Sequence, residues 1–258
     1  MQMTGNTILI TGGGSGIGLA LGLAFKELGN QVIIAGRNAA KLETAAAQGF
    51  ATQVVDMADY DSIQTLAKET LKLFPALNVV IHNAGIMKNE NLLKGAYSKV
   101  ENETIATNLL GPMRLTDALL PHFLKQKSAV VMTVTSGLAY LPLAMTPTYC
   151  ASKAAIHSYT QSLRYQLRDT TIQVIELVPP YVRTELMGDR QAQDPNAMPL
   201  ADFITEVMQI LSSNPAINEV IVKRVALLRY AAEAGTEKYD ATFKYFNDTL
   251  MKDRQSEF

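Results

Sequence analysis

The stretch that decides the fold is Thr11-Gly12-Gly13-Gly14-Ser15-Gly16-Ile17-Gly18. It directly follows the apolar run 7–10 and precedes a segment with helical periodicity, which puts the glycines in a turn between a strand and a helix. Glycines allow the backbone to turn tightly and to approach a ligand, while the free N–H groups at the helix start face negative charge. A flexible loop would also carry glycines, but this position favours a pyrophosphate-binding turn. The residues that we expect to bind there are Gly12, Gly14, Ser15, Gly16, Ile17 and Gly18.

Short apolar runs rich in β-branched residues alternate along the chain with longer segments of helical periodicity. The runs cover residues 7–10, 31–34, 52–55, 79–81, 129–132, 173–175 and 220–222. Because each run is almost wholly apolar, we expect strands that are buried on both faces, as in a parallel sheet. Right-handed βαβ crossovers then predict an α/β fold with a doubly wound, seven-stranded parallel sheet and helices on both faces.

The chain contains no Pro/Ser-rich linker, no charge block and no internal repeat, so we predict one domain over residues 1–258. Residues 179–199 depart from the rhythm, because they hold four prolines and little periodicity just beyond the sixth run. Ligands bind at that edge of open α/β sheets. This segment therefore predicts a substrate lid over about 179–213.

The C-terminal tail, about 224–258, is a second departure. Residues 224–234 and 238–251 each carry apolar residues at helical spacing, which predicts two amphipathic helices. Nothing in these residues indicates what the two helices do.

Charge and cysteine content exclude several classes of function. Lysine and arginine total 23 against 24 acidic residues, and no basic stripe is interleaved with aromatics, so nucleic acid is not an expected partner. Cys150 is the only cysteine, and with His82, His122 and His157 it offers no zinc spacing, so we predict no metal. No apolar run approaches the roughly 20 residues that span a membrane, and the N-terminus lacks signal-peptide features. A cytoplasmic protein is expected.

The end of the second predicted strand reads Ala35-Gly36-Arg37-Asn38, with glycine where an NAD enzyme usually carries an acid for the ribose 2′-hydroxyl. Without that carboxylate a 2′-phosphate is not repelled, and Arg37 can bind it bidentately. This favours NADP(H) over NAD(H), with a solvated surface arginine as the alternative. Asp56 and Met57 follow the third run and could flank the adenine, although Asp56 could equally be an ordinary acid at a helix start.

Tyr149 and Lys153 lie four residues apart at the predicted start of a helix and therefore share one face. A phenol with a pKa near 10 is a poor acid at neutral pH, and lowering it by roughly three units takes about 4 kcal/mol. An adjacent ammonium is the obvious source of that energy. Ser136, at the end of the fifth run, could hold a substrate oxygen beside Tyr149, and Asn108 could anchor a water that connects Lys153 to solvent. Each residue alone is unremarkable on a protein surface.

Together, these residues resemble the compact form of the short-chain dehydrogenase/reductase family, over roughly residues 5–225. The matching motifs, in order, are Thr11 to Gly18, Asn83-Ala84-Gly85, Asn108 with Leu109-Leu110-Gly111, Ser136, Tyr149 with Lys153, and Pro179 followed by Val182 and Thr184. The chain as a whole is also similar to a bacterial branch of oxidoreductases, some of them named for the operon that D-alanylates teichoic acid.

The resemblance implies an oxidoreductase that transfers a hydride between a nicotinamide, here NADP(H), and a carbonyl or alcohol. Tyr149 would donate the proton in reduction, and Lys153 would lower its pKa and bind the nicotinamide ribose. Ser136 would position the carbonyl, and Asn108 would support the proton relay. The remaining implied cofactor contacts are Asn83, Ala84, Gly85, Pro179, Val182 and Thr184.

Two positions depart from the family pattern, since His82 replaces an asparagine and Pro180 replaces a glycine. The resemblance also implies a homodimer or homotetramer, built from the helices around 98–126 and 147–168. A small-molecule carbonyl or alcohol is the expected substrate. The residues that flank the expected cleft favour a medium-sized apolar carbonyl, with ordinary core or interface packing as the alternative. The flanking residues are Leu138, Leu141, Leu143, Met145, Leu186 and Met187.

Two other functions fit the same fold. A noncatalytic NADP(H) sensor or scaffold is the first, although such proteins typically lose the tyrosine or the lysine. Epimerisation or dehydration is the second, although the related chains that perform it usually carry a larger C-terminal substrate region.

Overall fold

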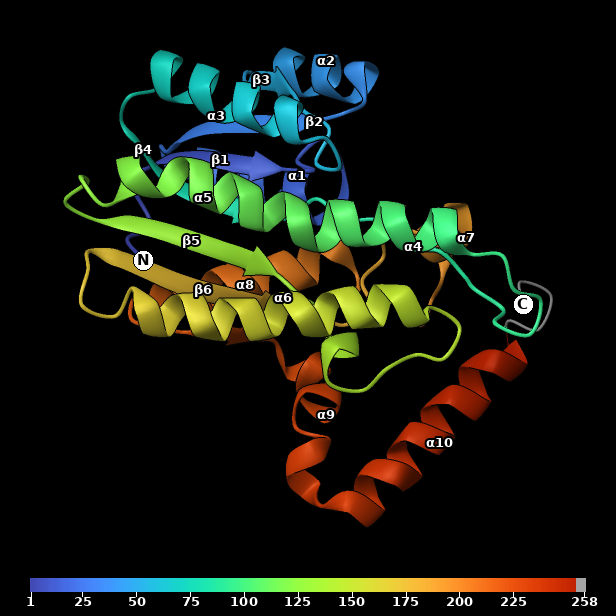
Figure 1. Ribbon diagram of the computed structural model, residues 1–258. Coiled ribbons are helices and arrows are strands. Elements are labelled where there is room, and N and C mark those ends of the chain that lie inside the picture. Colours follow the sequence, from blue (N-terminus) through green and yellow to red (C-terminus); the bar gives the residue numbers. More distant parts are fainter. Residues whose placement is uncertain (254–258) are drawn as a thin grey trace.

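A seven-stranded parallel sheet forms the centre of the computed structural model, which describes residues 1–253 (Figure 1). The strand order is β3-β2-β1-β4-β5-β6-β7, so the chain winds outward from β1 to one edge and then from β4 to the other. Every strand pairing is parallel, which confirms the predicted doubly wound sheet. The strands are β1 (Thr7–Thr11), β2 (Gln31–Gly36), β3 (Ala51–Val54), β4 (Leu77–His82), β5 (Ala129–Val134), β6 (Ile172–Val178) and β7 (Glu219–Ile221).

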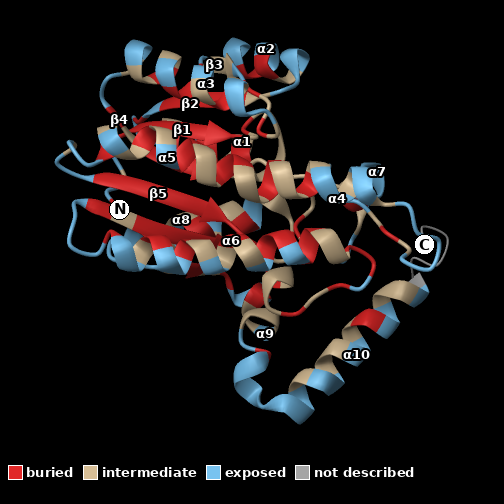
Figure 2. Ribbon diagram, in the orientation of Figure 1, coloured by how far each residue is buried: buried red, intermediate tan, exposed pale blue. Residues whose placement is uncertain are grey.

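Helices cover both faces of the sheet, as predicted. On one face lie α1 (Gly16–Glu27), α2 (Ala39–Ala47) and α8 (Leu200–Ser213), and on the other lie α3 (Tyr60–Leu73), α5 (Gly111–Phe123) and α6 (Pro147–Gln166). Successive side chains of a strand point to opposite faces, so Ile8 and Ile10 join the first core and Leu9 joins the second. Figure 2 shows the resulting layer of buried strands between half-exposed helices. Among the described residues, no helix is long and apolar enough to cross a membrane.

The helix that precedes β5 contains an irregular turn. It begins as α4 (Ser98–Ile105), passes through a π-helical turn at Ala106–Leu110 and continues as α5. Such turns insert an extra residue into a helix and recur at functional sites. Asn108 lies in this turn and is buried.

The segment after β6 divides into two parts that differ in burial. A short helix, α7 (Asp189–Gln193), follows an irregular stretch that begins at Pro179. The next helix, α8, packs against α1, with Phe203, Val207 and Leu211 fully buried in the core. Residues 200–213 are thus part of the sheet cover, and only 179–199 remain as the predicted lid.

The C-terminal tail differs from the prediction in its first half. Instead of one helix over 224–234, the chain forms a 3₁₀ turn at Lys223–Val225, the single turn α9 (Ala226–Arg229) and another 3₁₀ turn at Ala232–Ala234. Gly235, at a φ of 91°, then lets the chain reverse direction into α10 (Thr236–Asp253). The prediction of one helix was wrong because packing against the body of the protein interrupts this segment. Residues 254–258 of the predicted tail lie outside the described residues.

Candidate active site

The glycine-rich turn leaves no room for side chains at two of its positions. A Cβ atom on Gly12 would lie 2.7 Å from the Cα atom of Ala84, and one on Gly18 would lie 2.4 Å from the Nδ2 atom of Asn83. Gly12 and Gly16 also have positive φ values, of 64° and 54°, which other residues rarely adopt. The turn is therefore pressed against the end of β4, and the first turn of α1 follows it immediately.

Asn83 fastens this turn to the end of β4. Its Nδ2 group donates to the carbonyl oxygens of Thr11 and Gly12, each at 3.1 Å. In return, the Thr11 hydroxyl oxygen accepts from the backbone N–H groups of Asn83 and Ala84, each at 3.2 Å. Since its amide is hydrogen-bonded to the turn, Asn83 holds the turn in this shape.

A cavity of about 380 Å³ lies beside this turn. It brings together most of the residues predicted to bind the cofactor, and four of the predicted residues lie outside its lining. The predicted residues that line it are Gly12, Ser15, Gly16, Ile17, Arg37, Asn83, Ala84, Gly85, Ser136, Tyr149, Lys153, Pro179, Val182 and Thr184. The four outside it are Gly14, Gly18, Asp56 and Met57.

Packing explains why these four lie elsewhere. Gly14 lies against the Cβ atom of Lys41, which would be 3.1 Å from a Cβ added to the glycine, and Gly18 lies beneath Asn83. The Asp56 carboxylate is 3.8 Å from Arg37 and accepts a hydrogen bond from the Ala58 N–H, so it orders the chain before α3. Met57 is 3% exposed, and its side chain packs into the core.

Lys41 lines the same cavity as Arg37, and the sequence analysis did not include it. It lies in the first turn of α2, and its ammonium pairs at 2.9 Å with the Glu185 carboxylate, which comes from the predicted lid. The spacing of four residues from Arg37, across the start of a predicted helix, was the signal that could have identified it.

The four predicted catalytic residues are all buried. Tyr149 is 7% exposed, Ser136 is 8%, Lys153 is 5% and Asn108 is 2%. The Oγ atom of Ser136 accepts a hydrogen bond from the Leu138 N–H at 3.1 Å, and Ser136 lines the same two cavities as Tyr149. The Lys153 ammonium lies 5.5 Å from the centre of the Tyr149 ring and donates to the Val134 carbonyl at 2.8 Å.

Burial acts on both ionisable groups in the direction of the neutral form. Burial raises the pKa of Tyr149, while the nearby Ser136 hydroxyl opposes this rise. Burial lowers the pKa of Lys153 to about 8. The predicted lowering of the tyrosine pKa by Lys153 is therefore not found in this structure, because desolvation of the phenol is the larger effect.

Asn108 lines neither cavity and instead holds the start of α6, the helix that carries Tyr149 and Lys153. Its Oδ1 atom accepts from the Ile86 N–H and its Nδ2 group donates to the Ile86 carbonyl, both at 2.9 Å. The same Nδ2 group also donates to the Ser152 hydroxyl, which in turn donates to the carbonyl of Tyr149. Asn108 thus connects the loop after β4 to the start of α6.

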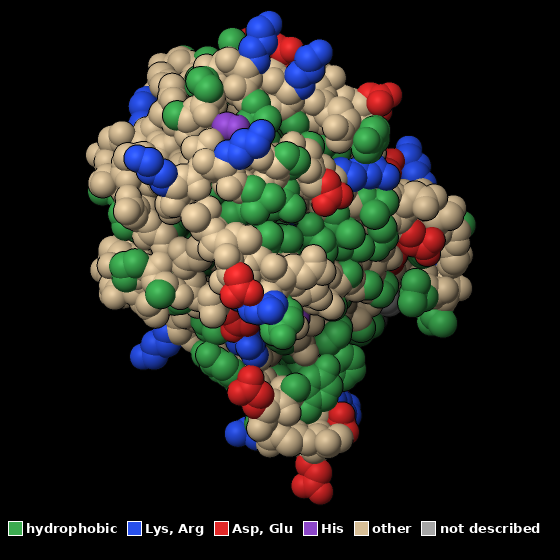
Figure 3. All heavy atoms as spheres, turned by 60° about the vertical axis from the view of Figure 1, so that its left-hand side comes forward, with side chains coloured by type: hydrophobic (Ala, Val, Ile, Leu, Met, Phe, Trp, Pro, Cys, Tyr) green, Lys and Arg blue, Asp and Glu red, His purple; other side chains and the backbone are tan. Residues whose placement is uncertain are grey.

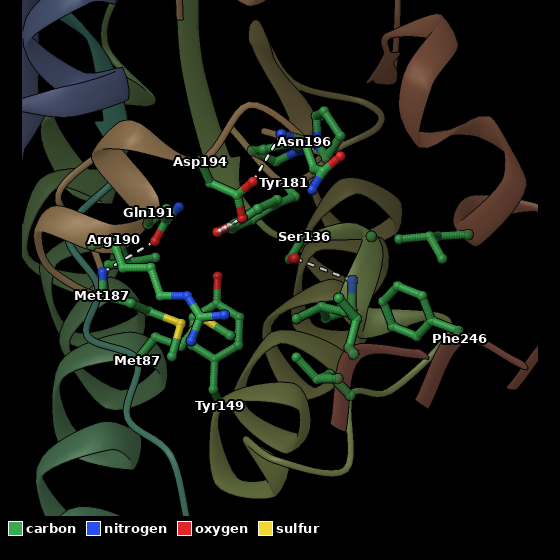
Figure 4. Close-up of a pocket in the computed structure, with 18 of the residues that line it drawn as sticks. Met87, Ser136, Tyr149, Tyr181, Met187, Arg190, Gln191, Asp194, Asn196 and Phe246 are labelled. Atoms are coloured by element: carbon green, nitrogen blue, oxygen red, sulfur yellow. Dashed lines mark hydrogen bonds between the residues drawn. The ribbon is translucent and has the colours of Figure 1, made fainter. Parts of the chain in front are cut away.

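A second cavity, of about 860 Å³, shares Ser136 and Tyr149 with the first (Figure 4). Of the apolar residues expected at the cleft, Leu138, Leu143, Leu186 and Met187 line it. Leu141 and Met145 do not, because both are fully buried in the core. The sequence analysis missed Met87, Leu228, Phe246 and Leu250 in this lining.

His82, the departure from the family pattern at the end of β4, is a neutral residue inside the protein. Thr116 donates its hydroxyl hydrogen to the Pro112 carbonyl, so the His82 Nε2–H group donates to the Thr116 oxygen at 2.9 Å. The Nδ1 atom is buried without a hydrogen-bond partner among residues 1–253. Burial lowers the pKa of His82 to about 3.

The fold and these cavities define a dinucleotide-binding oxidoreductase of the Rossmann type. The family model described as short chain dehydrogenase matches residues 6–195, and the chain belongs to that family. It is 41% identical over 253 residues to the uncharacterized oxidoreductase DltE of Bacillus subtilis, covering 96% of this chain and 98% of that protein. The protein is therefore a short-chain dehydrogenase/reductase of the DltE-like branch.

Solved structures of this fold are similar over most of the chain. One is a short-chain dehydrogenase/reductase from Burkholderia phymatum in complex with NAD, at a TM-score of 0.77 and 20% identity over 90% of this chain and 95% of that one. Another is a short-chain dehydrogenase from Burkholderia cenocepacia in complex with NADP, at a TM-score of 0.77 and 22% identity over 91% and 94%. At these identities the likeness concerns the fold.

Proposed function

We propose that the protein is an NADP(H)-dependent reductase or dehydrogenase that interconverts a carbonyl and an alcohol, with Tyr149 as the general acid and base. The observation that carries this proposal is the position of Ser136 and Tyr149 on the wall shared by the two cavities. One cavity has the glycine turn and Lys153 in its lining, and the other is wide enough for a small-molecule substrate. A group bound in each would meet at the tyrosine hydroxyl.

The residues of the smaller cavity suit a nicotinamide dinucleotide. The two left-handed glycines provide a close backbone approach, and Ser15, at the start of α1, makes no capping hydrogen bond with its side chain. The backbone N–H groups of the first helical turn thus remain for a pyrophosphate. When bound, the nicotinamide supplies or accepts the hydride.

The protonation states of the site suit a reductase. Because burial raises the pKa of Tyr149, its hydroxyl keeps its proton at neutral pH and can donate it to a carbonyl oxygen. Ser136, on the same cavity walls as the tyrosine, orients that oxygen. Lys153, which still carries its charge below pH 8, stabilises the phenolate left by the proton transfer and can bind the nicotinamide ribose.

The preference for NADP(H) rests on two cations in one cavity. Arg37 and Lys41 both line it, at the end of β2 and the start of α2, where a dinucleotide places its adenine ribose. Glycine, not an acid, ends β2. A 2′-phosphate would be bound by Arg37 and could take Lys41 from its pair with Glu185.

The proposal also includes a cytoplasmic homodimer or homotetramer formed through the helices around 98–126 and 147–168. The predicted lid at 179–199 would close over the substrate. Epimerisation and a noncatalytic sensor are the competing functions, and the retained tyrosine, lysine and serine favour redox chemistry over the sensor.

Oxidation of NADPH and of NADH by the purified protein, across a panel of aldehydes, ketones and diketones, tests the proposal. We expect turnover with NADPH that Tyr149→Phe lowers by about 10³-fold without changing NADPH affinity. Tyr165→Phe, on an exposed side chain of the same helix, is the matched control. Binding of NADPH without turnover of any carbonyl would favour the sensor, and turnover with NADH alone would exclude the NADP(H) preference.

A further inference from the structure

The C-terminal segment 223–253 forms one side of the larger cavity. Its side chains there are largely apolar and come from α9 and from the second half of α10. They are Leu228, Phe246, Thr249 and Leu250. In Figure 4, Phe246 lies on one side of Tyr149 and Ser136, whereas Arg190, Gln191 and Asp194 of segment 179–199 lie on the other. The C-terminal side of the cavity is thus largely apolar, whereas the side formed by 179–199 carries charged and amide groups next to Leu186 and Met187. The catalytic hydroxyls lie between the two sides.

Three attachments hold this segment against the catalytic residues, and the first is at Gly137. A Cβ atom on this glycine would lie 2.7 Å from Val225 Cγ2 and 2.8 Å from Leu228 Cδ1. The tail therefore packs directly onto the backbone next to Ser136. A side chain at residue 137 would push the tail away from the cavity.

The second attachment is Arg229, which lies over the ring of Tyr140 at 4.5 Å and forms a bidentate ion pair with Glu219. The Tyr140 hydroxyl donates at 3.0 Å to Glu176, which is fully buried on β6 and also pairs with His157. Ligand atoms of His157, Glu176 and Glu219 lie within 4.8 Å of one another. Arg229 supplies the positive charge beside these carboxylates and ties α9 to the sheet.

The third attachment is Asn247, the one residue of α10 that is polar and buried, at 6% exposure, in the part of the helix whose side chains are described. Its Oδ1 atom accepts from the Ala144 N–H at 2.6 Å, and its Nδ2 group donates to the Pro142 carbonyl at 3.1 Å. Both bonds reach the loop between Ser136 and α6, more than 100 residues away in sequence. On either side of Asn247, Phe246 and Leu250 pack on the cluster that contains Tyr149 and Leu143.

We propose that α10 is the specificity-determining wall of the substrate pocket and selects a carbonyl or alcohol compound with an extended apolar group. This inference rests on the proposed function. Phe246 and Leu250 bind that apolar group, and Asn247 is the positioning residue that keeps the helix at the correct distance from Tyr149. A cavity of about 860 Å³ is far larger than a small ketone needs, and an extended apolar group would fill its α10 side.

A homologous series of ketones, from 2-butanone to 2-decanone, tests directly whether α10 contacts the apolar group of the substrate. In the unaltered protein we expect kcat/KM to rise with chain length, by up to about fourfold for each methylene that becomes buried. Phe246→Ala and Leu250→Ala should each lower kcat/KM for 2-decanone by about tenfold and change that for 2-butanone by less than twofold. Tyr245→Ala is the matched control, since this neighbour on α10 is 74% exposed. Equal slopes in Phe246→Ala and the control would overturn the proposal.

Asn247→Ala tests the positioning role separately. We expect KM for 2-decanone to rise about tenfold while kcat for 2-butanone stays within twofold, and Asn247→Gln should recover part of the loss. An equal loss on both ketones would mean that Asn247 serves stability alone and would overturn its positioning role.

A binding measurement distinguishes failure of the proposed role of α10 from failure of the proposed function. If no ketone is reduced although NADPH binds, the proposed function fails, and the wall is then tested by saturation-transfer NMR with 2-decanone. Signal transfer that is lost in Phe246→Ala and kept in Tyr245→Ala would support an apolar site at α10. No transfer, or equal transfer in both variants, would overturn it.

Discussion

The glycine-rich turn at residues 11–18 and the C-terminal segment 223–253, which includes the α10 wall, form different parts of the candidate active site. They are built in opposite ways. The turn presents mainly backbone, and at Gly12 and Gly18 the residues that follow β4 leave no room for a side chain. The wall consists of side chains, and tertiary contacts with Gly137, Tyr140 and the loop at 142–144 hold it in place. The turn therefore tolerates no added side chain at Gly12 or Gly18, whereas the wall can be reshaped to admit another substrate.

Among the substitutions that test this difference between the turn and the wall, Gly18→Ala should have the largest effect. Its methyl group would meet Asn83 at 2.4 Å, so we expect NADPH affinity to fall by about tenfold to 100-fold, measured by titration calorimetry. Phe246→Ala should leave that affinity unchanged. Leu23→Ala is the control, because this residue of the same helix has an exposed side chain. If the Gly18→Ala protein bound NADPH with unchanged affinity, the turn would not be less tolerant of substitution than the wall.

Arg37→Ala and Lys41→Ala test the other end of the proposed cofactor cavity, where side chains rather than backbone would bind the cofactor. Each should raise KM for NADPH about tenfold, because each removes a charge-assisted hydrogen bond to the 2′-phosphate. KM for NADH serves as the internal control and should change by less than twofold. A parallel rise for both cofactors would assign the two cations to a general structural role.

The pH profile of carbonyl reduction should report Lys153. Its lowered pKa, of about 8, means that the ammonium loses its charge above pH 8, and the phenolate of Tyr149 then loses its stabilising neighbour. We expect kcat/KM to be level below pH 8 and to fall about tenfold per unit above it. NADPH affinity, measured over the same range, separates a chemical effect from a binding effect. A level profile up to pH 10 would contradict this role.

His82→Asn should have the smallest effect on activity, and its main effect should be on the pH dependence of stability. The pKa of His82 is lowered from 6.5 to about 3 by folding, so its contribution to stability is complete above pH 6.5 and is lost as pH falls toward 3. The loss approaches about 1.4 kcal/mol per pH unit. The asparagine variant lacks this term, and the difference in urea unfolding free energy between the two proteins should therefore change between pH 7 and pH 4. A constant difference would show that His82 does not titrate on unfolding.

The sequence by itself determined the sheet and the cofactor turn, because both depend on local patterns. Apolar runs of strand length identified all seven strands, and a glycine turn between a strand and a helix needs only the residues within it. The spacing of Tyr149 and Lys153 followed from the helix period alone. Their pKa values did not, because the shifts depend on burial, which many distant residues create.

Only the tertiary structure decided the shape of the substrate pocket and the position of the tail. Leu141 and Met145 resembled pocket residues in sequence but are core residues, whereas Phe246 and Leu250 come from a helix about 100 residues beyond Tyr149. The spacing of Lys41 from Arg37 is visible in the sequence, but its pair with Glu185 depends on the fold. A local motif limits the backbone near itself, but a cavity wall is the sum of contacts between segments whose separation in sequence carries no record of their distance in space.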